Sequence, residues 1–98
     1  MSGMPIRDPW FVIRFWAWVR RAADDACWEW QGSIGSNGYG RLRHKGKTWL
    51  AHRIAYTLAN GPIPAGMFVC HACDNRRCVR ASHLFLGTHE DNIGDMVA

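Results

Sequence analysis

The sequence predicts a small α+β domain whose fold is stabilised by a zinc ion. Three observations predict this fold class: soft metal ligands recur at short intervals near the C-terminus, two apolar segments of strand length flank them, and two upstream segments have helical periodicity. A chain of 98 residues is expected to form a single domain, residues 1–98. Domains of this size bury only about 60 to 65% of their unfolded surface. A structural zinc, which contributes on the order of 10 kcal/mol in small metal-dependent folds, is therefore expected to matter for stability.

The N-terminal segment predicts a helix from Pro9 to about Ala23. Asp8 suits an N-cap, and proline is favoured at the first helical position. The aromatic rings of this segment exceed what one narrow buried stripe needs; they are Trp10, Phe11, Phe15, Trp16 and Trp18. Core packing is favoured for most of them, and the remainder makes this helix a candidate surface for a homodimer.

The next segments predict strands. Cys27 to Trp30 is expected to be extended, and residues 32–38, rich in Gly, Ser and Asn, form a loop. Tyr39 to Arg43 and Lys47 to Leu50 then predict a β-hairpin that turns near Lys45 and Gly46. His44 lies in this turn and is expected to be exposed, as is His89 further along.

A second helix is predicted after the hairpin. Ala51, Ile54, Ala55 and Leu58 repeat at helical spacing, and Asn60-Gly61-Pro62 is a typical stop signal. His52 lies on the other side of this helix. Because no partner lies at metal-ligand spacing, His52 is expected to be a surface or hydrogen-bonding histidine rather than a ligand.

The C-terminal third predicts strand, loop, strand and helix in that order. Met67 to Cys70 and Leu84 to Leu86 have strand length, and Gly87 ends the second strand. Thr88 and Asp91 fit a capping box, so a helix is expected to begin there. Asn92 falls in its first or second turn. This order places the His71 imidazole and the Asn92 amide near one loop.

Three ligands for a tetrahedral zinc lie in that loop: Cys73, Cys78 and His83 follow a C-x4-C-x4-H spacing. The fourth ligand is open. Cys70 would complete a set close in spacing to a zinc knuckle that binds single-stranded nucleic acid. Cys27 would instead join the N-terminal half to the loop. Strand alternation favours Cys27, since it sends Cys70 and His71 to opposite faces, with Cys70 packed in the core.

The basic residues predict a phosphate-binding surface. The formal net charge is +4, and ten of the twelve basic residues are arginine. Clustered arginine is typical of proteins that bind a nucleic-acid backbone, although a solvated basic face is the simpler alternative. The candidate DNA-binding residues are Arg41, Arg43, Lys45, Lys47, Arg53, Arg76 and Arg77.

Several classes of protein are excluded. The apolar run from Phe11 to Val19 is too short for a membrane span, is interrupted by Arg14, and lacks the cleavage pattern of a secretory signal. A reducing cytoplasm with metal-bound thiolates therefore explains the four cysteines better than two disulfides do. No P-loop or serine-nucleophile motif is present.

These motifs together resemble the zinc-containing HNH endonucleases of phages and homing elements, also called ββα-metal or His-Me finger nucleases. The resemblance extends beyond the core motif at residues 67–97. It includes the segments Arg14-Phe15-Trp16, CWEWQG from Cys27, Gly38-Tyr39-Gly40-Arg41, Ala51-His52-Arg53 and Gly61-Pro62-Ile63-Pro64. One departure is Arg80-Ala81, where such sequences usually have Asn-Pro.

The resemblance implies roles for individual residues. His71 matches the general base, and Asn92 matches the helix asparagine that holds a catalytic Mg²⁺ or Mn²⁺. Cys27, Cys73, Cys78 and His83 match the ligands of a structural Zn²⁺. Arg41 is our candidate for a charge-stabilising contact at the scissile phosphate.

The implied activity is metal-dependent hydrolysis of DNA phosphodiester bonds in the cytoplasm of a bacterium or a phage-infected host. Two noncatalytic alternatives remain: a knuckle-like zinc module that binds nucleic acid, and an inactive domain built on the nuclease scaffold. Neither target sequence nor nicking versus double-strand cleavage is readable from the residues.

Overall fold

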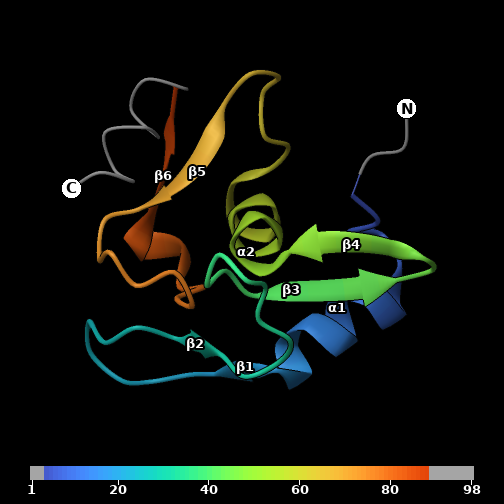
Figure 1. Cartoon of the computed structure of the whole chain (residues 1–98), viewed down its shortest axis with the longest axis horizontal. Coiled ribbons are helices and arrows are strands. Elements are labelled where there is room, and N and C mark those ends of the chain that lie inside the picture. Colours follow the sequence, from blue (N-terminus) through green and yellow to red (C-terminus); the bar gives the residue numbers. More distant parts are fainter. Residues whose placement is uncertain (1–3, 89–98) are drawn as a thin grey trace.

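In the computed structural model, residues 4–88 are described, and they form two α-helices and three two-stranded antiparallel sheets (Figure 1). The elements in chain order are α1 (Pro9–Ala17), β1 (Val19–Arg20), β2 (Glu29–Trp30), β3 (Arg41–His44), β4 (Lys47–Leu50), α2 (Ala51–Asn60), β5 (Phe68–His71), the 3₁₀ turn η1 (Ala81–His83) and β6 (Leu84–Gly87). The α+β class, the hairpin and the two helices agree with the sequence-based prediction. Neither helix in the described part of the chain is long and apolar enough to cross a membrane.

Helix α1 begins where predicted but ends early. The Asp8 carboxylate accepts a hydrogen bond from the backbone N–H of Trp10 at 3.0 Å, as an N-cap does. The helix ends at Ala17 rather than at about Ala23, because Val19 and Arg20 pair with Trp30 and Glu29 of β2. The predicted continuation is wrong because strand pairing with a distant segment outweighed local helical preference.

The core of the N-terminal half is aromatic. The Phe11, Phe15 and Trp30 side chains are fully buried, and the Phe15 and Trp30 rings stack with centroids 5.5 Å apart. Trp30 also explains why residue 40 is a glycine. A Cβ at Gly40 would lie 2.4 Å from the indole Cδ1 of Trp30. The β3 backbone therefore passes directly against this ring, which only a residue without a side chain permits.

The β3–β4 hairpin is tied to α1 through a buried histidine. His44 is 7% exposed, so the prediction that it is exposed in the turn is wrong. Its Nδ1 accepts a hydrogen bond from Arg14 at 3.1 Å, and its Nε2 donates to the Asp8 carboxylate at 3.0 Å. This bond is the main cause of a lowered pKa for Asp8. The ring thus joins the start of α1 to the turn, a link that no local pattern reveals.

Strands β5 and β6 flank the predicted metal loop. They pair antiparallel, with His71 opposite Leu84 and Cys70 opposite Phe85. The backbone N–H of Ala72 donates to the His83 carbonyl at 2.8 Å and closes the base of the loop. The two strands of the expected ββα-metal core are present. The predicted helix that carries Asn92, and His89 with it, lie outside the described residues.

Candidate metal centre and adjoining histidine cluster

Four side chains converge on one point beside β2 and the loop between β5 and β6. The ligand atoms of Cys27, Cys73, Cys78 and His83 all lie within 4.8 Å of one another. The His83 Nδ1 lies 3.6 Å from the Cys27 Sγ and 3.5 Å from the Cys78 Sγ. With ordinary zinc bond lengths, a tetrahedral site separates sulfur and nitrogen ligands by roughly 3.5 Å. The donor set and its spacing therefore fit zinc.

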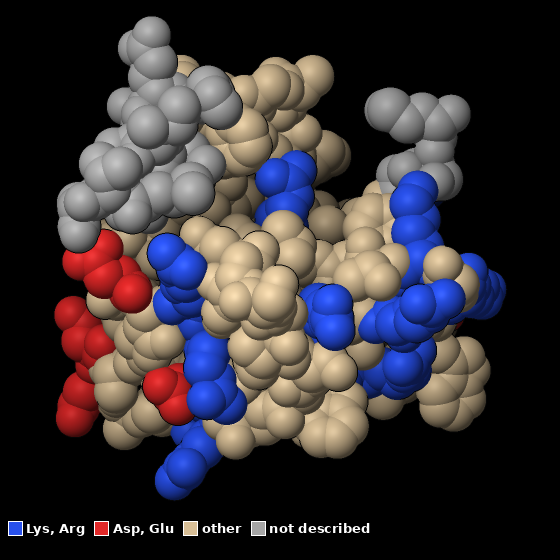
Figure 2. Space-filling view, viewed as in Figure 1, with Lys and Arg blue, Asp and Glu red and all other residues tan. Residues whose placement is uncertain are grey.

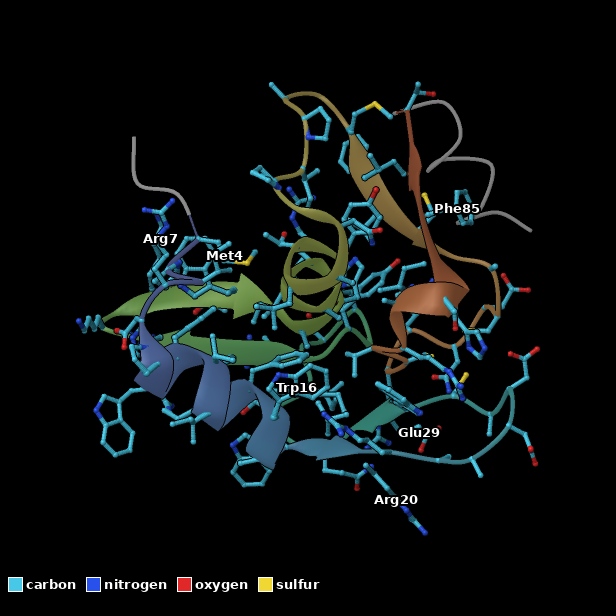
Figure 3. All side chains as sticks on the ribbon, turned by 180° about the vertical axis from the view of Figure 1, so that it is seen from behind. Met4, Arg7, Trp16, Arg20, Glu29 and Phe85 are labelled. Carbon is cyan, nitrogen blue, oxygen red and sulfur yellow. The ribbon has the colours of Figure 1, made fainter. Side chains whose placement is uncertain are left out.

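Backbone pairing explains how Cys27 reaches a loop about fifty residues away. Glu29 of β2 forms an isolated bridge with Cys78. The backbone N–H of Val79 donates to the Trp28 carbonyl at 2.8 Å, and that of Trp30 donates to the Arg77 carbonyl at 2.8 Å. Figure 3 shows Glu29 on β2, and its carboxylate accepts a hydrogen bond from the Asn75 amide at 3.0 Å. The segment from Cys27 is thus an extra strand laid against the metal loop.

Cys70 is not a member of the cluster. It is 2% exposed and lies in β5 among the core residues, as strand alternation predicted. The arrangement favours the Cys27 ligand set over the knuckle-like set that uses Cys70.

Burial raises the pKa values of the loop thiols. The main cause for both is desolvation, which brings Cys78 to about 12 and shifts Cys73 upward from 9.0. Both thiols are therefore protonated at neutral pH without a metal. Zinc coordination would replace these protons, so metal binding and proton release are coupled at this site.

Arg80, noted above as a departure from the HNH pattern, connects the metal loop to the segment before β2. Its guanidinium donates to the Ala26 carbonyl at 2.8 Å and lies 5.0 Å above the Trp28 ring. Both partners belong to the segment that supplies Cys27. The Arg80 side chain therefore connects this loop to the segment that precedes β2.

His71 is oriented by the same loop. Its Nε2 donates to the backbone carbonyl of the zinc-ligand candidate Cys78 at 3.0 Å, and its side chain is 3% exposed. Because a carbonyl only accepts, Nε2 carries the ring proton and Nδ1 is the basic nitrogen of the neutral imidazole. The metal loop thus sets the tautomer of the candidate base.

His71 forms a cluster of three aromatic rings with Tyr39 and His52. Tyr39 stacks on His52 with centroids 5.0 Å apart, and on His71 at 5.8 Å, while the His52 and His71 rings lie 4.9 Å apart. His52 is 5% exposed, so a surface position is wrong for it. Desolvation, reinforced by the neighbouring His71 and Arg53, lowers the pKa of His52 to about 3. His52 is therefore a neutral ring at physiological pH.

Sequence reasoning missed this cluster, although both outer members lie in motifs that were noticed. Tyr39 belongs to Gly38-Tyr39-Gly40-Arg41 and His52 to Ala51-His52-Arg53. The spacing of these motifs gives no sign that a loop residue and a helix residue meet at β5. The available signal was that both motifs, like His71, belong to the segments by which the chain resembles HNH endonucleases.

The candidate DNA-binding residues are at the surface. Six of the seven are exposed and Arg53 is half-buried. Figure 2 shows Lys and Arg gathered over the β3–β4 hairpin and in a second band, with Asp and Glu along the opposite edge. Arg41 and Arg43 occupy the same face of β3 and line a cavity with Trp18 and Gln31. Tyr39 and Arg76 line a different cavity, beside His52.

Comparison with known proteins agrees with the motifs. A profile of the HNH endonuclease family matches residues 50–93. The chain is 49% identical over 71 residues to protein 7.7 of Escherichia phage T7, covering 72% of this chain and 55% of that protein. It is 38% identical over 79 residues to protein 2.8 of the same phage, covering 79% of this chain and 53% of that protein. The chain thus spans about half the length of the curated relatives it matches. No solved structure matches significantly.

Proposed function

We propose that this chain, whose residues 50–93 belong to the HNH endonuclease family, is a metal-dependent DNA endonuclease with His71 as its general base. The observation that best supports the proposal is the hydrogen bond from His71 Nε2 to the Cys78 carbonyl at 3.0 Å. It fixes the ring orientation and places the ring proton on Nε2.

Hydrolysis of a phosphodiester requires an activated water, neutralisation of charge on the phosphoryl oxygens, and help for the departing oxygen. His71 Nδ1 would accept the proton of the attacking water, because a neutral imidazole has a pKa near the working pH. Arginine and lysine side chains would hold the flanking phosphates, since they are exposed along the hairpin and the metal loop. Arg41 is proposed to contact the scissile phosphate itself.

Two metals with different chemistry would serve the site. Cys27, Cys73, Cys78 and His83 would hold a zinc ion whose role is structural. A hard ion such as Mg²⁺ or Mn²⁺ would supply charge stabilisation at the scissile phosphate and the leaving oxygen. We assign Asn92, which lies outside the described residues, as an oxygen ligand of that ion. One neutral amide is a weak ligand, so tight binding of this ion is expected only with DNA present.

The test is incubation of zinc-loaded protein with supercoiled plasmid and Mg²⁺ or Mn²⁺. We expect nicked or linear product, and we expect His71→Ala to lower the cleavage rate by roughly 10²- to 10⁴-fold. Zinc content and DNA affinity should persist in that variant, because neither depends on the imidazole. A fully active His71→Ala protein would refute the assignment of the base.

A noncatalytic nucleic-acid-binding zinc domain is the second candidate. The 3% exposure of His71 favours it, since a general base must reach water. Retention of DNA with no cleavage under any divalent ion would support this candidate. In either case we propose that the protein acts in the cytoplasm of a phage-infected bacterium, as its phage relatives suggest. Self-association through the exposed rings of α1 stays a prediction that sedimentation can test.

A further inference from the structure

A cavity of about 260 Å³ adjoins the histidine cluster. The loop before β3, the junction of β4 with α2, strand β5 and the metal loop all contribute to its wall. Leu50 and Phe68 give it apolar surface, and His52, Arg53 and Arg76 give it polar groups. Ligand sites commonly combine apolar walls with a few convergent polar groups. The cavity is at the small end of such sites, which suits a single nucleotide unit.

His52 lines this cavity and carries a buried acceptor, its Nδ1. Among the described residues, no protein group bonds its Nδ1, although the atom is buried. The Val69 backbone carbonyl accepts from the other ring nitrogen, and the ring is neutral because its pKa is about 3. Nδ1 therefore presents a lone pair and no proton. A buried acceptor without a partner is unfavourable, so a ligand that donates a hydrogen bond would be selected.

Two cations complete the wall. Arg76 is held in place, because its guanidinium donates to the Asn37 carbonyl at 2.7 Å and lies 5.4 Å from the centre of the Tyr39 ring. Arg53 lines the same cavity from α2. Both guanidinium groups are always charged and favour a phosphate. The ligand therefore combines an anion with a hydrogen-bond donor and a flat apolar body.

We infer that this cavity binds one nucleotide of the substrate strand, next to the scissile phosphate, with its phosphate on Arg53 and Arg76 and its base donating to His52 Nδ1. The inference rests on the proposed nuclease function and adds a subsite to it. The position follows from the rings: His52, which lines the cavity, lies 4.9 Å from His71. A nucleotide held here is adjacent to the candidate base. The expected preference is for a base with an amino group, because the one N–H donor of thymine, at N3, is engaged in base pairing in a duplex.

The first experiment measures binding without any divalent ion. Zinc-loaded protein with ¹⁵N-labelled histidine is titrated with 2′-deoxyadenosine 5′-monophosphate, 2′-deoxyribose 5′-phosphate and inorganic phosphate. We expect the mononucleotide to shift the His52 Nδ1 resonance, and the two probes without a base to leave it in place. No shift with the mononucleotide, or an equal shift with inorganic phosphate, would overturn the subsite.

Variants separate the two halves of the ligand. His52→Phe keeps a ring against Tyr39 and His71 but removes the acceptor, so mononucleotide affinity should fall about tenfold while phosphate affinity stays. Arg76→Met should weaken both ligands about tenfold. Arg20→Met, an exposed change on β1, should weaken neither. Zinc content and thermal melting report folding, and if His52→Phe is unfolded, the contrast of Arg76→Met with Arg20→Met still decides.

Cleavage distinguishes this subsite from the nuclease proposal. In a defined duplex, an abasic residue at the position beside the cut should slow wild-type cleavage, and His52→Phe should abolish that penalty. A protein that binds the mononucleotide at His52 but never cuts DNA would keep the subsite and lose the nuclease. A protein that cuts DNA with no abasic penalty and no shift at His52 would lose only the subsite.

Discussion

Two regions of the molecule, the segment from α1 to β4 and the loop region at residues 70–83, are stabilised by different means. The N-terminal half, from α1 to β4, encloses fully buried aromatic rings, including Phe11, Phe15 and Trp30. Within residues 70–83, by contrast, Val79 is the aliphatic side chain that is buried. There the backbone is organised by the cysteine and histidine cluster and by hydrogen bonds to β2. His71 thus lies in the region with the smaller apolar core, where its ring is held by the Cys78 carbonyl and by ring contacts with Tyr39 and His52.

The largest expected effect comes from removing a zinc ligand. Cys27→Ala should abolish stoichiometric zinc and unfold the metal loop, since such sites contribute on the order of 10 kcal/mol to small folds. Cys70→Ala is the matched control, because Cys70 is a core residue outside the cluster. Zinc content and circular dichroism measure both. Loss of zinc with Cys70→Ala and retention with Cys27→Ala would reverse the ligand assignment.

The aromatic half should respond to loss of Trp30. Trp30→Ala removes a fully buried ring and should lower the free energy of unfolding by about 3 to 5 kcal/mol. Folded variant protein should still bind zinc with the normal stoichiometry, because Trp30 supplies no ligand atom. Denaturant unfolding with a parallel zinc assay tests this. Loss of zinc from the folded variant would show that the two halves are not separable.

Zinc affinity should rise with pH. The raised pKa values of Cys73 and Cys78 keep both thiols protonated at pH 7, so zinc must displace at least these two protons. Apparent zinc affinity should then rise by at least about a hundredfold per pH unit between pH 6 and 8. A chelator competition assay measures it.

Zinc affinity rises with pH, but the folding stability of the zinc-free protein should fall. A raised folded-state pKa contributes stability that is fully present below the unfolded value and is lost as pH rises through the folded value. For Cys78 this window runs from 9.0 to about 12. Zinc-free protein should therefore lose stability at alkaline pH, while zinc binding tightens. Equal zinc affinity at pH 6 and 8 would contradict the protonation of these thiols.

The smallest expected effect concerns the contact between Gly40 and Trp30. Gly40→Ala places a methyl group 2.4 Å from the indole and should destabilise the protein by about 1 to 3 kcal/mol. The penalty should shrink in a Trp30→Phe background, because a smaller ring leaves room. Thermal melting of the four proteins gives this coupling. Additive effects would show that the ring is not what requires glycine.

Local patterns predicted most of the fold. The Asp8-Pro9 start, the hairpin turn, α2 and the two strands around the metal loop follow from capping, turn and periodicity rules, and the structure has them. The end of α1 and the burial of His44 were not predictable. Each depends on a partner more than ten residues away, which propensity does not encode.

The candidate site was likewise predictable only where local patterns determine it. Spacing indicated three loop ligands, and strand alternation separated Cys70 from them. The third ring of the histidine cluster and the carbonyl that sets the His71 tautomer could not be inferred, because both require three-dimensional proximity. Tyr39 and His71 are 32 residues apart in sequence yet stack on each other. The role of Asn92 stays a prediction.

The pairing of residues 27–30 with the loop around Cys78 has a consequence for the order of events during synthesis. On a ribosome, the first ligand emerges long before the other three, and no tetrahedral site exists until His83 has left the exit tunnel. A nascent chain would therefore bring the four candidate ligands together only after His83 has been translated, 56 residues after Cys27.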